Sequence, residues 1–183
     1  MLLEEFENTS AVIEPTDTSI RGGGETCNTL ILSFNGEIIK RVAELENVYE
    51  GGALHNLNVR LPWYIYEESG VRVGVMLASI GASMIVGNLE ELKAKGFQNF
   101  IVFGTCGVLD RSIAVDKIIL PSSALRDEGT SYHYAPASDE ISYHSELLLT
   151  MEEALDQAGI EHVQTKTWTT DAFYRETAAK VKR

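Results

Sequence analysis

A short run of small and reactive residues, Gly104-Thr105-Cys106-Gly107, is the first place in this sequence where chemistry could occur. A hydroxyl and a thiol stand between two glycines, which let a ligand approach the backbone and leave amide N–H groups free to hold an anion. The thiol of Cys106 could act as a nucleophile, or it could be a small buried thiol that lines a pocket. The same run could also be a plain turn that binds no ligand.

The elements that precede this run would place it at the edge of a sheet. The apolar residues Phe100–Phe103 predict a strand that is buried on both faces. Before it come a predicted strand at Val71–Leu77, a small-residue turn at Ala78–Gly81, and a helix from Ser83, its N-cap, to Lys95. Strand, helix and strand in this order predict parallel neighbouring strands, whose carboxyl ends meet at one edge where ligands bind.

Two further segments carry residues suited to binding. Charges, hydroxyls and aromatics crowd the stretch Ala124–Tyr134, which is either a functional loop or a solvated loop whose aromatics cover the core or a partner subunit. Thr170-Asp171 follows a predicted strand and takes the same topological position as Gly104. The nearby Phe173 or Tyr174 could stack on a flat ring or belong to the core.

The rest of the chain alternates strands with helices, which predicts an α/β fold. Pro62 favours an edge position for its strand, because proline cannot donate to the sheet ladder. A hairpin turn at Glu67–Gly70 would join that strand to the next one. We expect further strands at Thr29–Phe34, Arg60–Glu68, Val115–Leu120 and Val163–Trp168, helices at Glu37–Leu45 and Tyr143–Ala158, and a loop at Asn47–Asn58.

Composition limits the class of protein. The 183 residues, 44% hydrophobic and 23% charged, suit one globular domain over residues 1–183. A net charge of −12 argues against nucleic acid and anionic lipid as partners. We expect a cytoplasmic protein without a membrane span or signal peptide, because the apolar runs are short, the first residues are acidic and there are only two cysteines.

Other kinds of site lack the residues that they need. The four histidines have neither i, i+4 spacing nor a cysteine partner, so no metal site is expected. No Gly-x-Ser-x-Gly elbow supports a serine hydrolase, and no Gly-x-Gly-x-x-Gly supports a dinucleotide fold.

Five segments, taken together and in order, resemble the nucleoside phosphorylase family, on its uridine phosphorylase side. The similarity runs from about Val71 onward. The segments are Ser79–Gly81, Glu90-Glu91-Leu92, Phe103–Gly107, Arg126–Tyr134 and Thr170–Tyr174.

The resemblance implies a three-layer αβα sandwich around a mixed β-sheet, assembled as dimers or trimers of dimers. It also implies a reaction in which inorganic phosphate, as co-substrate and without any further cofactor, attacks C1′ of a nucleoside. The products would be ribose 1-phosphate and a free base, from uridine or a purine nucleoside. The enzyme's task would be to position phosphate and to stabilise charge on the departing base.

The resemblance also distributes roles over two sets of residues, without naming a catalytic one. Arg60 would act from the neighbouring subunit. For phosphate and ribose the set is Gly104, Thr105, Arg60, Ser79 and Gly81. For the base it is Cys106, Gly107, Thr170, Asp171 and Phe173.

Three departures from the family pattern indicate impaired catalysis. Val102 stands where the family carries a phosphate-binding arginine, and the N-terminal Pro-Gly-Asp-Pro loop has no counterpart. The Glu-Met-Glu stretch that holds ribose would lie beyond Arg183, so we expect a chain shortened at its C-terminus. One alternative is a catalytically silent module that binds nucleobases or assembles; another is a nucleosidase that uses water.

Overall fold

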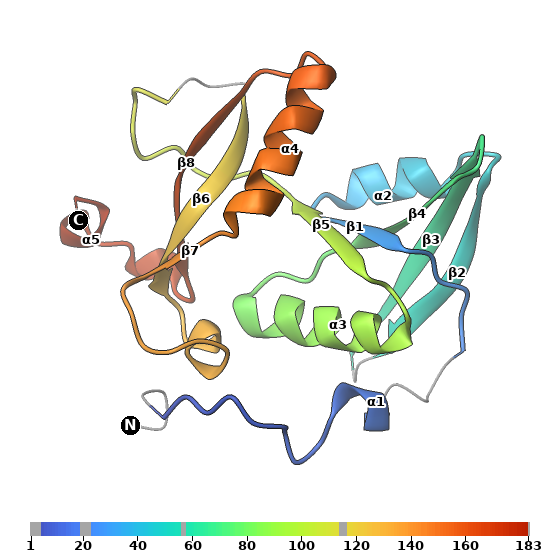
Figure 1. Ribbon diagram of the computed structural model, residues 1–183, viewed down its shortest axis with the longest axis horizontal. Helices are drawn as coiled ribbons and strands as arrows, with labels where there is room; N and C mark the ends of the chain where they lie inside the picture. The colour runs from blue at the N-terminus through green and yellow to red at the C-terminus, as the bar shows by residue number, and fades with distance from the viewer. Residues whose placement is uncertain (1–4, 19–22, 56–57, 114–116, 183) are drawn as a thin grey trace. The chain divides into compact units, whose positions relative to one another are not determined.

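The computed structural model describes residues 5–18, 23–55, 58–113 and 117–182. The chain forms two compact units, each with its own sheet (Figure 1). The N-terminal unit comprises Thr9–Thr105, and the C-terminal unit comprises Cys106–Arg183 with Met1–Asn8. That residues 1–183 make a single domain stays a prediction.

The N-terminal unit is built on a mixed five-stranded sheet with the strand order β2-β3-β4-β1-β5. β4, β1 and β5 are parallel, whereas β2, β3 and β4 form an antiparallel meander. The crossover from β4 through α3 to β5 therefore leaves room for β1 between those two strands. The bounds are α1 Pro15–Thr18, β1 Thr29–Ser33, α2 Gly36–Ala43, β2 Val48–His55, β3 Arg60–Glu68, β4 Val71–Leu77, α3 Ala82–Lys95 and β5 Asn99–Phe103.

β3 is an inner strand, so its predicted edge position is wrong. It pairs with β2 on one side and β4 on the other. Pro62 is tolerated because the pairs with β4 begin only at Trp63, one residue later. The predicted loop at 47–58 is also wrong over β2, where a β-bulge between Glu50 and Gly52 interrupts the pairing with β3.

The glycines of β2 make room for Trp63, whose side chain is fully buried. A Cβ on Gly52 would lie 2.4 Å from Cζ2 of the indole, and one on Gly51 would lie 2.6 Å from its Nε1. The indole N–H donates to the carbonyl of Glu25 at 2.8 Å. Phe97 meets the ring edge-on, with the ring centroids 5.8 Å apart. The glycines therefore serve packing.

β5 is the last strand of its sheet, and the expectation that it is buried on both faces is wrong. Ile101, Val102 and Phe103 are each more than 40% exposed. β1 is an inner strand, between β4 and β5, and its Leu30 and Leu32 are fully buried. Run length alone could not tell which of two apolar strands is an inner one.

Helices cover both faces of the five-stranded sheet, as Figure 1 shows for α2 and α3. Leu92 of α3 belongs to the main core cluster, whereas Ile39 of α2 is buried outside that cluster. This confirms the expected αβα layering. The cluster consists of Leu30, Leu32, Leu54, Leu61, Trp63, Ile65, Met76, Ala78, Leu92 and Phe97.

The C-terminal unit has a three-stranded sheet with the order β7-β6-β8. β6 and β8 are parallel and joined through α4, while β7 is antiparallel to β6. β6 continues past Pro121, where its register with β8 shifts, and is longer than predicted. The bounds are β6 Ile118–Asp127, β7 Glu140–Ser142, α4 Ser145–Gln157, β8 His162–Thr170 and α5 Ala178–Val181, with 3-10 turns η2 at Thr130–His133 and η3 at Phe173–Arg175.

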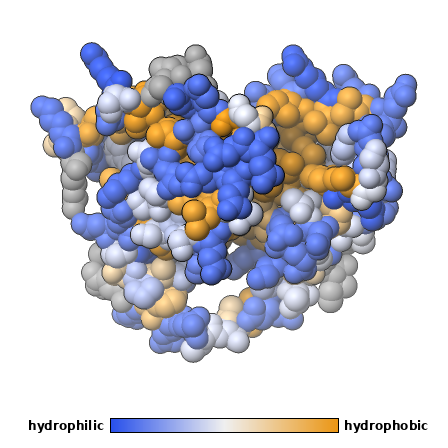
Figure 2. Space-filling view, turned by 45° about the horizontal axis from the view of Figure 1, so that its top comes forward, coloured by the Kyte–Doolittle hydropathy of each residue, from blue (hydrophilic) through white to orange (hydrophobic). Residues whose placement is uncertain are grey.

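Hydrophobic side chains reach the surface in both units (Figure 2). Examples are Ile101 in the N-terminal unit and Leu149, which is 56% exposed, in the C-terminal unit. Within the described ranges, none of the helices is long and apolar enough to span a bilayer.

Candidate active site

The carboxyl ends of three parallel strands meet at one edge of the N-terminal unit. The amide of Ala78, just after β4, donates to the carbonyl of Ser33 at 2.9 Å, and the amide of Phe34 donates to the carbonyl of Phe103 at 3.4 Å. The turn that contains Ser79 and the Gly104 loop therefore follow strands that end side by side with β1. The predicted convergence of these two segments is confirmed.

The turn after β4 delivers the chain into the N-terminus of α3. Gly81 occupies the N-cap with φ of 102°, a conformation that favours glycine, and no side chain caps the helix there. The predicted N-cap, Ser83, lies inside the helix. The first turn carries no acidic residue. The uncapped amides and the positive end of the helix dipole can therefore attract an anion.

Gly104 and Thr105 leave β5 at the same edge. A Cβ on Gly104 would lie only 2.8 Å from Cδ2 of Phe34, so glycine lets the chain pass the ring. Thr105 is exposed. Cys106, which belongs to the C-terminal unit, is exposed and forms no disulfide, so the interpretation of its thiol as buried is wrong. At Gly107, an added Cβ would meet no atom within 4 Å.

Arg60 begins β3 and lies at the edge where the antiparallel β4 ends. Its guanidinium forms an ion pair with Glu50 on β2, and Nη1 donates to Oε2 of that carboxylate at 3.2 Å. Hydrogen bonding to Arg60 lowers the pKa of Glu50. The arginine therefore shares the edge of the sheet with Ser79, but its charge is already partnered within the chain.

The C-terminal unit brings two predicted base-site residues to the ends of β6 and β8. Thr170 is in register with Asp127, and the amide of Asp171 donates to the carbonyl of Asp127 at 3.1 Å. The Asp171 carboxylate accepts from the amide of Gly129 at 2.9 Å, and Oγ1 of Thr170 accepts from the amide of Ala172 at 3.2 Å. Both side chains thus stabilise the loops in which they lie.

An ion pair closes the same end of this sheet. Nζ of Lys180 on α5 lies 2.7 and 2.9 Å from the two carboxylate oxygens of Asp127. Hydrogen bonding to Lys180 lowers the pKa of Asp127, and hydrogen bonds involving Thr170 and Trp168 act in the same direction. The pair ties α5 to β6.

Phe173 and Tyr174 lie just beyond these ends and are 63% and 91% exposed, so the interpretation of them as core aromatics is wrong. Their ring centroids are 4.4 Å apart. Exposed rings at the end of a strand can stack on a flat ligand.

Arg126 lies in the stretch Ala124–Tyr134 that the sequence singled out, but its structural role there was not predicted. It is 8% exposed, and its guanidinium lies 4.0 Å from the ring centroid of Tyr132. Ser131, one of its acceptors, is itself hydrogen-bonded to Glu128. This network makes the stretch 126–138 a folded loop. Nε donates to Oγ of Ser131 at 2.8 Å, Nη1 to the carbonyl of Pro136 at 2.7 Å and Oγ of Ser138 at 2.9 Å, and Nη2 to the carbonyl of Ala135 at 3.3 Å.

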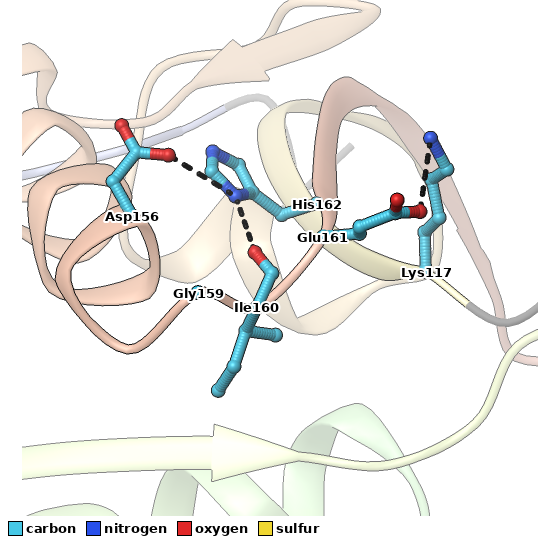
Figure 3. Close-up of a pocket in the computed structure, with 6 residues that line it drawn as sticks. All are labelled: Lys117, Asp156, Gly159, Ile160, Glu161 and His162. Carbon is cyan, nitrogen blue, oxygen red and sulfur yellow. Dashed lines mark hydrogen bonds and ion pairs between the residues drawn. The ribbon is translucent and has the colours of Figure 1, made fainter.

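A pocket of about 360 Å³ lies at the ends of β6 and β8 that are opposite to Thr170 and Asp171 (Figure 3). His162 points toward Asp156 there, with Nδ1 3.0 Å from the carbonyl of Ile160. Nζ of Lys117 pairs with Glu161 at 3.5 Å. The polar groups satisfy one another, and no predicted site residue lines this pocket. Within the described residues, no three His, Cys, Asp or Glu side chains form a group that could hold a metal ion.

Comparison with known proteins identifies the family. The family model described as Phosphorylase superfamily matches residues 29–183. A uridine phosphorylase of Thermococcus kodakarensis is 31% identical over 151 residues, which are 82% of this chain and 53% of that protein. A DeoD-type purine nucleoside phosphorylase of a Geobacillus species is 26% identical over 160 residues, covering 84% of this chain and 65% of the relative.

Solved structures share the fold. The crystal structure of a uridine phosphorylase from Vibrio fischeri matches with a TM-score of 0.67 and 22% identity, over 84% of this chain and 62% of that one. A purine nucleoside phosphorylase from Toxoplasma gondii, solved in complex with immucillin-H, matches with a TM-score of 0.68 and 18% identity, over 85% and 62%. The chain thus spans between half and two thirds of these relatives' length. Because the family model matches residues 29–183, most of the sequence, the chain belongs to the phosphorylase superfamily.

Proposed function

We propose that this chain carries the phosphate and nucleoside sites of a nucleoside phosphorylase. The reaction is the attack of inorganic phosphate on C1′ of a nucleoside, which breaks the N-glycosidic bond and yields a free base and ribose 1-phosphate. Inorganic phosphate is the co-substrate, and the proposal needs no other cofactor. Its main support is the edge of the N-terminal unit where Ser79, the uncapped α3 and Gly104-Thr105 follow neighbouring parallel strands.

Phosphate would be held at this edge by neutral donors. The amides of the first turn of α3 and the hydroxyls of Ser79 and Thr105 can each donate to a phosphate oxygen. Val102 is apolar, and Arg60 already pairs with Glu50. Hydrogen bonds to charged donors contribute about 1.5–3 kcal/mol each, so a site without them binds phosphate weakly. We therefore expect slow turnover.

The base would be held by the C-terminal unit. Cys106 and Gly107 provide an open, small-residue approach, and the exposed ring of Phe173 offers a stacking surface. Thr170 and Asp171 would act by stabilising the loops next to Phe173, because their side chains already accept hydrogen bonds from backbone amides.

The test is product analysis with uridine, inosine and guanosine, each with and without phosphate. We expect free base and ribose 1-phosphate, formed only when phosphate is present. Free ribose without phosphate would instead support a nucleosidase. Binding of base without turnover would support a silent binding module, the alternative favoured by the internal pairing of Arg60 with Glu50.

We also propose that the protein self-associates through the outer side of β5. This edge of the sheet presents Ile101, Val102 and Phe103, each more than 40% exposed, on a strand that pairs only with β1 among the residues that the structure describes. Light scattering coupled to size-exclusion chromatography should give a dimer or larger species, and a monomer at all concentrations would contradict this.

A cytoplasmic location is proposed as well, supported by two cysteines that are both unpaired.

A further inference from the structure

Asn88 is a polar residue on the buried face of a helix. It lies three residues after Ile85 and four before Leu92, so it shares their side of α3. Leu92 is fully buried and Ile85 packs against the same core cluster, while Asn88 is 7% exposed. Burying a side-chain amide is costly unless it makes hydrogen bonds, so a specific partner is needed.

That partner is Ser79. Nδ2 of Asn88 donates to Oγ of Ser79 at 2.8 Å, from the middle of α3 back to the turn that precedes the helix. A serine hydroxyl that accepts a hydrogen bond still has its own proton to donate. In this contact a lone pair of the hydroxyl faces Asn88, which leaves the hydroxyl proton to donate to another acceptor.

We infer that Asn88 is a positioning residue that orients Ser79 as a hydrogen-bond donor to a phosphate oxygen. The inference rests on the proposed function, because it assigns the donated proton to the anion at the N-terminus of α3. It explains why the apolar face of α3 contains an amide. It also makes the turn selective for groups that only accept hydrogen bonds there, such as the ionised oxygens of phosphate.

The test is the dissociation constant for inorganic phosphate, measured by isothermal titration calorimetry. Asn88→Leu keeps the side chain's size in an apolar setting and removes the donor. We expect about tenfold or greater weakening for Ser79→Ala, which removes a hydrogen bond to a charged oxygen. For Asn88→Leu, which leaves the hydroxyl in place but no longer oriented, we expect about three- to tenfold weaker binding. Asn88→Ala is a second variant should leucine perturb the packing. Asn99→Leu, at an exposed asparagine that begins β5, is the matched control and should bind phosphate normally.

The double variant separates positioning from a general structural role. If Asn88 acts through Ser79, then Asn88→Leu adds no further weakening in a Ser79→Ala background. Asn88→Asp should weaken binding more than Asn88→Leu, because a carboxylate accepts the serine proton and brings negative charge toward the anion.

Several results would overturn the inference alone. One is normal phosphate binding by Asn88→Leu when Ser79→Ala binds weakly. Another is a loss of phosphate affinity on Asn88→Leu that is equally large in the unmodified protein and in the Ser79→Ala variant. Normal binding by Asn88→Asp would show that Ser79 donates toward the helix, which also contradicts it. Failure of the unmodified protein to bind phosphate would instead contradict the proposed function itself, and this role with it.

Discussion

The two units present their candidate site residues in opposite ways. In the N-terminal unit, Ser79 and Gly104 follow the two strands that flank β1, whose Leu30 and Leu32 are fully buried, and no side chain caps α3. In the C-terminal unit, Thr170 and Asp171 are occupied by backbone amides of their own loops. The first unit has free amide donors that can bind an anion, whereas the second has exposed aromatic rings on a loop that is held by its own hydrogen bonds.

The two units also differ in the kind of side chain that they bury. Among the described residues, Leu120 is the only buried apolar side chain of the C-terminal unit, while the N-terminal unit buries large side chains such as Trp63 and Phe97. The C-terminal unit buries Arg126 and Ser123 instead. Apolar burial is the main favourable contribution to folding, so the N-terminal unit is expected to be the more stable.

The largest expected effect is on the N-terminal core. Trp63→Ala removes a fully buried indole together with its hydrogen bond to Glu25, and should lower the free energy of unfolding of this unit by about 3–5 kcal/mol. Hydrogen exchange resolved by residue measures this unit by unit. Trp168→Ala, at a partly exposed tryptophan of β8, is the matched control and should cost less. Equal losses for the two variants would contradict the difference between the cores.

The next effect concerns the polar core of the C-terminal unit. Arg126→Met removes four hydrogen bonds made by the buried guanidinium, although its acceptors are partly or fully exposed and can bond to water instead. We expect a loss of about 1–3 kcal/mol in that unit, from the net contribution of these hydrogen bonds. Arg175→Ala, at an exposed arginine, should change stability by less than about 0.5 kcal/mol. If Arg126→Met is as mild as this control, the network does not hold the loop.

A smaller effect, on binding alone, is expected at Phe173. Phe173→Ala should weaken nucleobase binding by about 1 kcal/mol, because one aromatic stacking contact contributes this much, and should leave thermal unfolding unchanged. Tyr174→Ala is the comparison, since that ring is even more exposed. Fluorescence or calorimetric titration with uracil and with a purine base measures the change. Unchanged affinity for both bases would remove Phe173 from the site.

The smallest effect is the pH dependence of the pair between Asp127 and Lys180. Lys180 lowers the pKa of the Asp127 carboxyl, so the pair stabilises the fold above the unfolded carboxyl's pKa of about 4. The contribution is lost as the pH falls through the lower folded pKa. Both side chains are about a third or more exposed, so it should stay below about 1 kcal/mol. The stability difference between the unmodified protein and Lys180→Met should vanish toward pH 2; a difference that persists there would contradict this assignment.

The sequence was informative where local pattern and topology agree. Strand, small-residue turn, helix and strand between Val71 and Phe103 could be predicted, and with them the meeting of Ser79 and Gly104. The burial of β5 could not, because an apolar run does not state whether it ends a sheet. The strand β2 could not be predicted either, because its glycines suggested a loop, whereas in the structure they leave space for Trp63.

Side-chain roles were harder to predict than positions. Thr170 and Asp171 could be placed at a strand end, but only the structure shows that their oxygens accept backbone amides. Arg126 is one charge among several in the sequence, and its burial depends on acceptors up to twelve residues away. Asn88 did carry a signal, a polar residue at apolar helical spacing, whose meaning required Ser79 beside it.

The most direct test of the central claim is amide hydrogen exchange with and without inorganic phosphate, followed by nuclear magnetic resonance. The account predicts slower exchange on phosphate addition at the first turn of α3, Ala82–Met84, and at Gly104-Thr105. Exchange that does not change at these amides, or protection confined to the pocket around Lys117 and His162, would contradict it.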